Sequence, residues 1–315
     1  MTITTTTTLP APLQASFSMK LLSVPTPYLI HKLGANLKTM PRNGGSTLRM
    51  RRYNPLATAM VPLGNSGITP PPQNLTALNI DAAISFYGTY ILMNEQVTLM
   101  AQDPVLNEAS IRLGVSLRQT EDQLMRDMLA SSIAFVNCTN GTDGDSPTEI
   151  TRADIDIVTR SLRNANARPF ISGMEGEMKI GSAPVRDAFL ALGHTNLIGQ
   201  IDNCTGFIQK WNYPNQQSTI EAEHGSVGNM RFMLSSVGSV IPNASMLGAD
   251  VYNIFCHGKE AFAAIEMDQY AAQFIYLPPI YSGPLALNAS LGYKMAEAPR
   301  LLQDSWMVRL RCTLA

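Results

Sequence analysis

The chain has 315 residues, of which 45% are hydrophobic and only 15% are charged, whereas roughly a quarter of an average soluble protein is charged. This length can bury one large core or two, and the scarcity of charge favours an obligate oligomer whose subunits cover one another. No run of about 18 uncharged apolar residues occurs, so the sequence predicts no membrane span. Its Thr-rich start also lacks the basic and apolar regions typical of a secretory signal.

The charge of the chain is unevenly distributed. Because the whole chain has 23 basic and 24 acidic groups, residues 81–315 hold 16 basic groups against 24 acidic ones. Such polarity predicts that the basic arm binds a nucleic acid, a membrane surface or the acidic body of another copy. The first eighty residues have no Asp or Glu, and their seven basic side chains are Lys20, Lys32, Lys38, Arg42, Arg49, Arg51 and Arg52.

Residues 1–45 are rich in Thr, Pro and Gly, which predicts an extended arm without a core of its own. A break at residues 43–46 precedes a strand at residues 47–53. This strand places Leu48 and Met50 on one face and basic residues on the other.

A Pro-rich, irregular tip follows to Gln73, and the chain then returns in a second strand. The two strands predict a long hairpin, and because a lone two-stranded ribbon is barely stable in water, it needs a surface to lie on. One face of the second strand is predicted to be apolar and consists of Leu78, Ile80, Ala82, Ile84 and Phe86.

Asp103 and Pro104 form a strong helix start and predict a helix over residues 104–131, about 40 Å long. Three pairs of opposite charge four residues apart, Glu108/Arg112, Arg118/Asp122 and Asp122/Arg126, are predicted on its polar face. Such a helix is typical of a spine on which other elements lie. Its apolar stripe is Leu106, Leu113, Leu117, Leu124 and Met128.

Residues 137–147 are rich in turn formers and indicate a domain boundary. Thr151 and Asp154 resemble a capping box that opens a further helix. Residues 251–256 are predicted to form a strand, and residues 306–312 a closing strand with one buried face.

The sequence contains no phosphate-binding loop, nucleophile elbow or zinc-protease motif, and predicts neither an enzyme nor a cofactor site. Glu221, Glu223 and His224 come nearest to a metal cluster, but alternation places His224 on the opposite face, which favours a solvated strand edge. An enzyme site assembled from His194, Glu221 and His224 stays open as an alternative. The spacing of the four cysteines fits neither a zinc motif nor a disulfide framework and predicts buried, reduced thiols.

The string Arg51-Arg52-Tyr53-Asn54-Pro55-Leu56 follows a Gly-containing break and precedes a Pro-rich tip and a strand that ends in Phe86-Tyr87-Gly88. This order resembles the major capsid proteins of tailed phages of the N-four type, which have the Hong Kong 97-type capsid fold. The resemblance covers most of residues 44–312. It continues through the long helix and at residues 180–194, 225–231, 251–261 and 291–294.

The resemblance implies an α+β fold with four parts. These are an N-terminal arm (1–45), an extended β-hairpin loop (46–87), a peripheral domain with the spine helix (88–145 and 285–315) and an axial domain (146–284). It further implies that the loop lies over a neighbouring subunit. Contacts between subunits are expected at Arg42, Arg49, Arg51, Arg52, Tyr53, Asn54 and Pro55.

The implied function is that of a structural major capsid protein that forms hexamers and pentamers of an icosahedral phage head around double-stranded DNA. Its expected partners are itself, a portal protein, and scaffold or decoration proteins, with non-specific contact to packaged DNA in the lumen. Its expected location is the virion shell, assembled in the host cytoplasm.

Two other functions remain as alternatives. A nanocompartment shell protein of the same fold would enclose an enzyme instead of a genome, and a nucleic-acid-binding protein would use the basic arm. Only Arg49, Arg51 and Arg52 are closely spaced, which disfavours specific reading of a nucleic acid. A membrane partner is disfavoured because no basic amphipathic helix is present.

Overall fold

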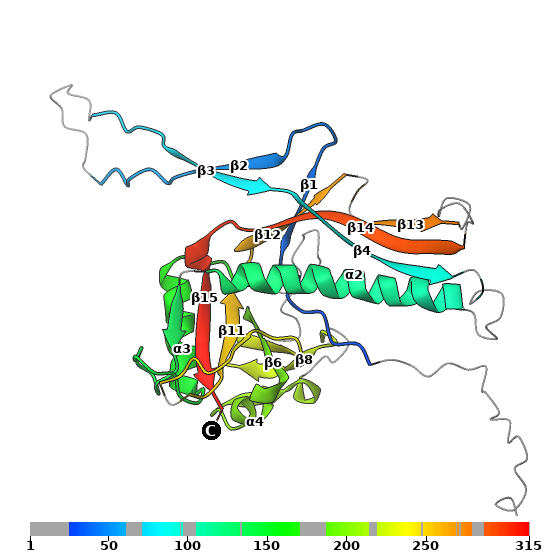
Figure 1. The fold of residues 1–315 in the computed structure, drawn as a ribbon. Helices are drawn as coiled ribbons and strands as arrows, with labels where there is room; N and C mark the ends of the chain where they lie inside the picture. The colour runs from blue at the N-terminus through cyan, green and yellow to red at the C-terminus, as the bar shows by residue number, and fades with distance from the viewer. Residues whose placement is uncertain are drawn as a thin grey trace, which may run out of the picture.

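A computed structural model describes residues 25–60, 71–94, 96, 105–132, 134–170, 187–213, 219–246, 248–268, 270, 272–278 and 287–314. Figure 1 shows a long helix, α2 (Val105–Ala130), that crosses the middle of the molecule between two sheets. A two-stranded ribbon projects from the smaller sheet. Within these residues no helix is long and apolar enough to cross a membrane.

The smaller sheet is built around one long strand, β14. β4 runs antiparallel to one edge of β14, whereas β12 and then β13 pair with successive parts of the other edge. β1 pairs in parallel with the far edge of β12. The strands are β1 (Asn36–Met40), β4 (Ser85–Asn94), β12 (Phe262–Met267), β13 (Gln273–Leu277) and β14 (Asn288–Leu301).

The larger sheet has the order β5-β15-β11-β6-β9-β8-β7, with β10 paired to β11. Helices α3 (Arg152–Asn164) and α4 (Ile198–Asp202) pack on one face, and their apolar residues share a core with the sheet. The strands are β5 (Phe135–Asn137), β6 (Phe189–His194), β7 (Phe207–Gln209), β8 (Glu223–Val227), β9 (Met230–Ser235), β10 (Val240–Ile241), β11 (Val251–His257) and β15 (Met307–Thr313).

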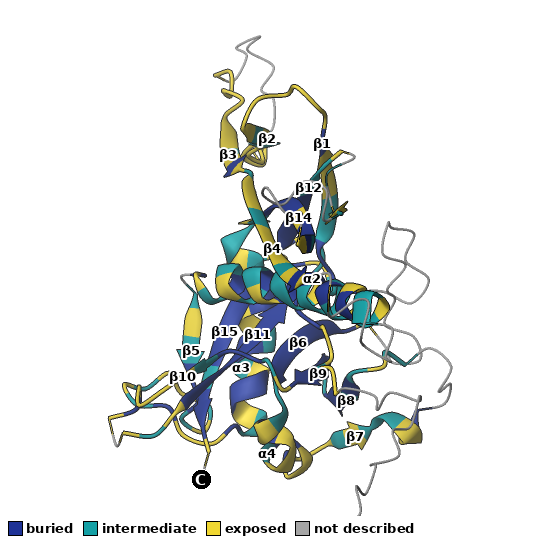
Figure 2. Cartoon of the chain, turned by 45° about the vertical axis from the view of Figure 1, so that its right-hand side comes forward, coloured by how far each residue is buried: buried dark blue, intermediate teal, exposed yellow. Residues whose placement is uncertain are grey.

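The predicted helix after Thr151 and the strand over residues 251–256 are confirmed. The closing strand is also confirmed as β15, but the prediction that only one of its faces is buried is wrong. β15 lies inside the larger sheet between β5 and β11, and apolar cores cover both faces. Most of its residues are therefore buried, and Figure 2 colours them dark blue.

The predicted hairpin is confirmed as the ribbon, in which β2 (Thr47–Tyr53) pairs antiparallel with β3 (Ala77–Ala83). Ile84 donates its N–H to the carbonyl of Ser46 at 3.0 Å, and from Ser85 the chain pairs with β14 instead. The change of partner also changes which side chains face inward. Phe86, expected on the apolar inner face, is therefore exposed.

The long helix is confirmed within one residue at each end. Leu113 and Leu117 are buried against β14 and β4, and Leu106 and Leu124 pack half-buried beside them. Further along, Met128 packs half-buried on a second core that the helix shares with the larger sheet. That core also buries Met125 and Leu129, which the sequence analysis did not include in the stripe.

The polar face of α2 is only partly as predicted. Glu108 and Arg112 form the expected ion pair. The two pairs expected for Asp122 are wrong, because its carboxylate is buried and binds His31 instead. A helical period cannot distinguish a solvated acid from one that a distant segment covers.

Residues 25–40, here called the strap, run beside α2 and end in β1. Ile30, His31 and Met40 are each at most 1% exposed. The sequence predicts an extended arm without a core of its own at residues 1–45, which is wrong for the strap, because the strap is buried in its own chain. Apolar side chains with partners in both sheets explain this difference.

Candidate assembly surfaces

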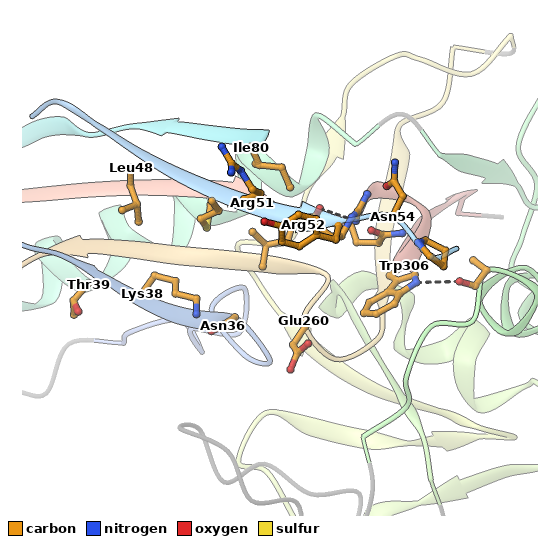
Figure 3. Close-up of a pocket in the computed structure, with 16 residues that line it drawn as sticks. Asn36, Lys38, Thr39, Leu48, Arg51, Arg52, Asn54, Ile80, Glu260 and Trp306 are labelled. Carbon is orange, nitrogen blue, oxygen red and sulfur yellow. Dashed lines mark hydrogen bonds between the residues drawn. The ribbon is translucent and has the colours of Figure 1, made fainter. Parts of the chain in front are cut away.

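The inner face of the ribbon overhangs the body of the molecule. Leu48, Met50 and Ile80 line a groove of about 830 Å³. Figure 3 shows this groove between the ribbon and β1. Trp306 closes one end, and its indole N–H donates to the carbonyl of Ala165 at 3.0 Å. The groove combines an apolar lining with basic groups near its mouth.

One of the three closely spaced arginines is already neutralised within the ribbon. Arg49 lies opposite Asp81 in the register, and its guanidinium donates to both carboxylate oxygens, at 2.7 and 2.9 Å. These hydrogen bonds hold the pKa of Asp81 below its usual range. Asp81, the first acidic residue of the chain, therefore pairs with an arginine of the neighbouring strand in the same ribbon. The charge of Arg49 is thus not free for another subunit.

The next two arginines have no acidic partner among the described residues. Arg51 Nε donates to Asn79 Oδ1 at 3.1 Å, and Arg52 Nη1 donates to the carbonyl of Leu302 at 3.4 Å. Both line the groove, opposite Glu260 and Lys38. The ribbon thus carries two positive charges that no acidic side chain of the described residues compensates.

The remaining predicted contact residues lie in two places. Tyr53, Asn54 and Pro55 are exposed at the mouth of the groove, where the amide N–H of Asn54 donates to the carbonyl of Thr76. Arg42 does not line the groove, and its guanidinium lies 5.1 Å from the ring centre of Tyr270. The seven residues therefore do not form a single site.

The outward face of the smaller sheet is apolar and uncovered among the described residues. Tyr90 of β4 and Ile275 of β13 lie on either side of Gly292 of β14. A groove of about 370 Å³ runs between them. A Cβ atom at position 292 would lie 2.8 Å from Cβ of Tyr90, so the close approach of these strands requires glycine.

The strap is held by a cluster of charges that the sequence analysis did not find. Lys32 Nζ lies 2.6 Å from Glu266 Oε1 and 3.8 Å from both Glu121 Oε2 and Glu297 Oε1. Burial raises the pKa of Glu297 to about 7, although Lys32 acts in the opposite direction. Beside it, His31 donates its backbone N–H to Asp122 Oδ1 at 2.8 Å, and His31 Nδ1 lies 2.6 Å from Asp122 Oδ2.

The histidines of the alternative enzyme site have separate hydrogen-bond partners and do not form one site. His194 Nδ1 accepts the N–H of Asn196, whereas His224 Nε2 lies 2.6 Å from Asp202 Oδ1. Glu223 was expected at a solvated edge, which is wrong: it is buried and paired with Arg231 across the β8–β9 turn.

Throughout the described part of the chain, no group of three or more His, Cys, Asp or Glu side chains could hold a metal ion. The prediction of reduced, buried cysteines is confirmed for Cys138, Cys204, Cys256 and Cys312.

Comparison with known proteins gives a likeness in structure alone. No protein-family model matches the chain, and no curated protein matches its sequence. The acid-stable capsid of Helicobacter pylori bacteriophage KHP30 has a TM-score of 0.70 at 10% identity, with 100% of this chain and 99% of that chain covered. The capsid of cyanophage Pam1 gives 0.67 at 12% identity, with 97% of each chain covered. The capsid of Ralstonia phage GP4 gives 0.67 at 10% identity, with 96% of each chain covered.

The chain has the Hong Kong 97-type capsid fold. The predicted α+β class is confirmed, as is the resemblance in fold that the Arg-Arg-Tyr-Asn-Pro-Leu string indicated. The ribbon, the long helix and both sheets all lie within the matched region, because each match spans nearly the whole of both chains.

Proposed function

We propose that this chain is the major capsid protein of a tailed phage and assembles into hexamers and pentamers of an icosahedral shell around double-stranded DNA. The observation that supports this most is the likeness in fold to phage capsids over the full length of the chain. Its role is structural, not enzymatic, and its chief partner is itself.

The domain division follows the capsid fold. The ribbon within residues 46–87 is the extended loop, and residues 88–145 with 285–315 form the peripheral domain around α2. Residues 146–284 form the axial domain near the centre of each ring. Both sheets cross this division, because β12 and β13 of residues 146–284 pair with β14, and β15 of residues 285–315 pairs with β11. The arm, residues 1–45, begins outside the described residues and continues into the strap.

The ribbon supplies the contact between neighbouring subunits. Its described tip residues, 54–60 and 71–76, are all exposed. A two-stranded ribbon gains stability only when a further surface covers it. The tip has no charged residue between Tyr53 and Ile80, so its apolar side chains favour burial on a second copy.

Arg51 and Arg52 determine which surface of the neighbouring subunit the ribbon contacts. Charge complementarity across an interface selects the partner and the register more than it adds affinity. Two arginines without a carboxylate partner among the described residues favour an acidic patch on the next subunit, in a body with an excess of acidic groups. A portal protein, scaffold or decoration proteins and packaged DNA are further partners, in a virion shell assembled in the host cytoplasm.

The first experiment is expression of the chain alone, followed by size exclusion and negative-stain microscopy. Rings of capsomer size or uniform closed shells are expected. A monomer that binds DNA in a salt-dependent manner and never assembles would overturn the proposal and favour nucleic-acid binding. A gene next to those for a portal and a terminase would separate a phage shell from a nanocompartment.

The second experiment reverses the charge of the ribbon. Arg51→Glu with Arg52→Glu is expected to abolish assembly and leave a subunit with unchanged circular dichroism. The matched control, Arg51→Lys with Arg52→Lys, keeps both charges and is expected to assemble. Normal particles from the glutamate variant would refute the charge argument.

A further inference from the structure

Many acidic side chains of the body form ion pairs within the chain, but one exposed group does not. The sequence has no Lys or Arg between Arg126 and Arg152, nor between Arg231 and Lys259. Arg126, Arg152 and Arg231 pair with other acids. Among the described residues, the acids of these two segments that are exposed and without an ion pair are Asp143, Asp145, Glu149 and Asp250.

The structure brings the two loops that carry these acids together. Ser146 Oγ lies 3.5 Å from the Oγ of Ser245, which belongs to the loop that joins β10 to β11. Thr313 lies opposite Val251 in the register and donates its N–H to the carbonyl of Thr148 at 3.0 Å. The four carboxylates therefore come from neighbouring loops at one end of the larger sheet.

The same loops present one large apolar side chain to solvent. Met246, next to Ser245, is 81% exposed. Asp143 Oδ1 accepts the N–H of Asn137, and Asp250 Oδ1 accepts the N–H of Asn243, both at 3.0 Å, so two of the carboxylates are held in place by the backbone. The four acids with Met246 are here called the acidic surface.

The groove under the ribbon has the complementary properties. Its charged lining consists of three basic side chains and one acidic one, and its apolar lining includes Leu48, Met50 and Ile80. Methionine is unbranched and flexible, so it fits an irregular apolar groove well. Figure 2 shows the ribbon and β10 on opposite sides of α2, so the acidic surface lies away from the groove of its own chain.

We propose that the acidic surface of one subunit docks in the ribbon groove of the next, with Met246 against the apolar lining and the carboxylates beside Arg51 and Arg52. This rests on the proposed function and deepens it, because it names the acidic patch that the ribbon meets. Opposite charges on the two surfaces select this partner and fix its register.

The docking joins two different surfaces, so the contact is heterologous. Each copy offers one groove and one acidic surface, and such a head-to-tail contact makes a ring when the rotation closes. A two-fold contact would instead bury the same patch on both copies. The docking therefore belongs within a hexamer or pentamer.

An exchange of charges tests the docking. Asp145→Lys with Glu149→Lys is expected to lower the yield of rings at least tenfold, with unchanged circular dichroism, because like charges then face each other. These two acids are chosen because Asp143 and Asp250 bind the backbone of their loops. A chain that also carries Arg51→Glu and Arg52→Glu restores the opposite charges and is expected to form rings within threefold of the wild-type yield.

The matched control is Asp187→Lys with Glu221→Lys, which makes the same change of net charge at two exposed acids outside the acidic surface. It is expected not to rescue Arg51→Glu with Arg52→Glu. Equal rescue by this control, or no rescue by Asp145→Lys with Glu149→Lys, would overturn the docking.

A cross-link tests the head-to-tail arrangement. Met50→Cys with Met246→Cys in one assembled full-length chain, treated with copper phenanthroline, is expected to give a ladder of three or more linked chains on a non-reducing gel. Each single variant is expected to give at least tenfold less cross-linked product, since all four native cysteines are buried. Dimers that never extend would show a two-fold contact and overturn the docking.

These outcomes separate the docking from the proposed function. If the wild-type chain makes neither rings nor shells, the proposed function fails. If the wild-type chain makes rings while the charge exchange gives no rescue or the paired cysteines give no ladder, only the docking fails.

Discussion

At the scale of residues, Lys32 holds together groups from three elements. Glu121 comes from α2, Glu266 from β12 and Glu297 from β14, and one ammonium lies within 3.8 Å of all three carboxylates. Neither oxygen of Glu297 has a hydrogen-bond partner among the described atoms, and the carboxyl is 3% exposed. A buried acid without a donor favours its neutral form, so the cluster keeps a proton at pH values where an exposed glutamate has lost it.

This proton predicts how stability depends on pH. Burial raises the pKa of Glu297 from 4.5 to about 7. The folded state thus binds a proton that the unfolded state has released, and the free energy of unfolding falls as pH rises from about 4.5 to 7. Glu297→Gln removes this dependence. Urea unfolding of the subunit is expected to show the variant gaining about 2–3 kcal/mol on the wild type between pH 4.5 and 8.

Glu266→Gln is the control for this prediction. It removes the carboxylate closest to Lys32, at 2.6 Å, so the variant is expected to be less stable than the wild type at pH 8. A constant difference between Glu297→Gln and the wild type across the pH range would show that Glu297 carries no such proton.

At the scale of elements, the ribbon and the body are stabilised in different ways. The ribbon keeps its register through main-chain pairing and the contact of Arg49 with Asp81, while its tip is exposed. α2 buries apolar side chains against both sheets. The stability of the subunit therefore depends on α2, and the ribbon tip has little part in it.

Replacing residues 55–75 with Asn-Gly tests this separation. The new turn joins Asn54 to Thr76, which already share a hydrogen bond of 2.9 Å, and Asn-Gly favours a tight hairpin. The unfolding free energy is expected to change by less than about 0.5 kcal/mol, as for surface changes, while shell formation is lost. Closed shells from the shortened chain would show that the tip is dispensable for assembly.

The elements that were predicted correctly are those in which apolar residues repeat at a short, regular spacing along the sequence. The ribbon alternates in steps of two and α2 repeats in steps of three and four, so their sequences contain the pattern. The strap could not be found in this way, because Lys32 meets partners that are far away in the chain. One missed contact had a local signal: Glu223 and Arg231 are opposite charges on either side of the turn at Gly228 and Asn229.

The surfaces were less predictable than the fold. The sequence indicated which arginines belong to the ribbon, but Arg49 and Asp81 are both polar residues on exposed strands, and only the register shows that they pair. The exposure of β13 depends on β1 ending beside β12 and not extending along β13, which no local pattern encodes.

At the scale of the whole molecule, α2 and the strap join the two sheets. The N-terminal half of α2 packs on β14 and β4, its C-terminal half packs on the larger sheet, and the contact of His31 with Asp122 lies between these halves. The chain is therefore expected to unfold as one cooperative unit and not sheet by sheet.

Asp122→Ala tests this coupling. It leaves the backbone N–H and Nδ1 of buried His31 without the carboxylate that they contact, and a buried polar group left unpaired costs about 1–3 kcal/mol. Tryptophan fluorescence and circular dichroism are expected to report one coincident transition, shifted to lower urea. Asp127→Ala, at an exposed position of the same helix, is expected to change stability by less than about 0.5 kcal/mol. Two separated transitions in either variant would contradict the coupling.

The strap also determines how the subunit bears tension at its N-terminal segment. A pull on the chain before residue 25 first meets the carbonyl of Tyr28, which accepts from Ser235 Oγ, then His31 and Lys32, and last the five parallel rungs of β1 on β12. Because β1 would slide along its neighbour, its rungs share the force and do not open one after another. Under an increasing force, the side-chain contacts of the strap are therefore expected to break first, and the pairing of β1 with β12 is expected to break last.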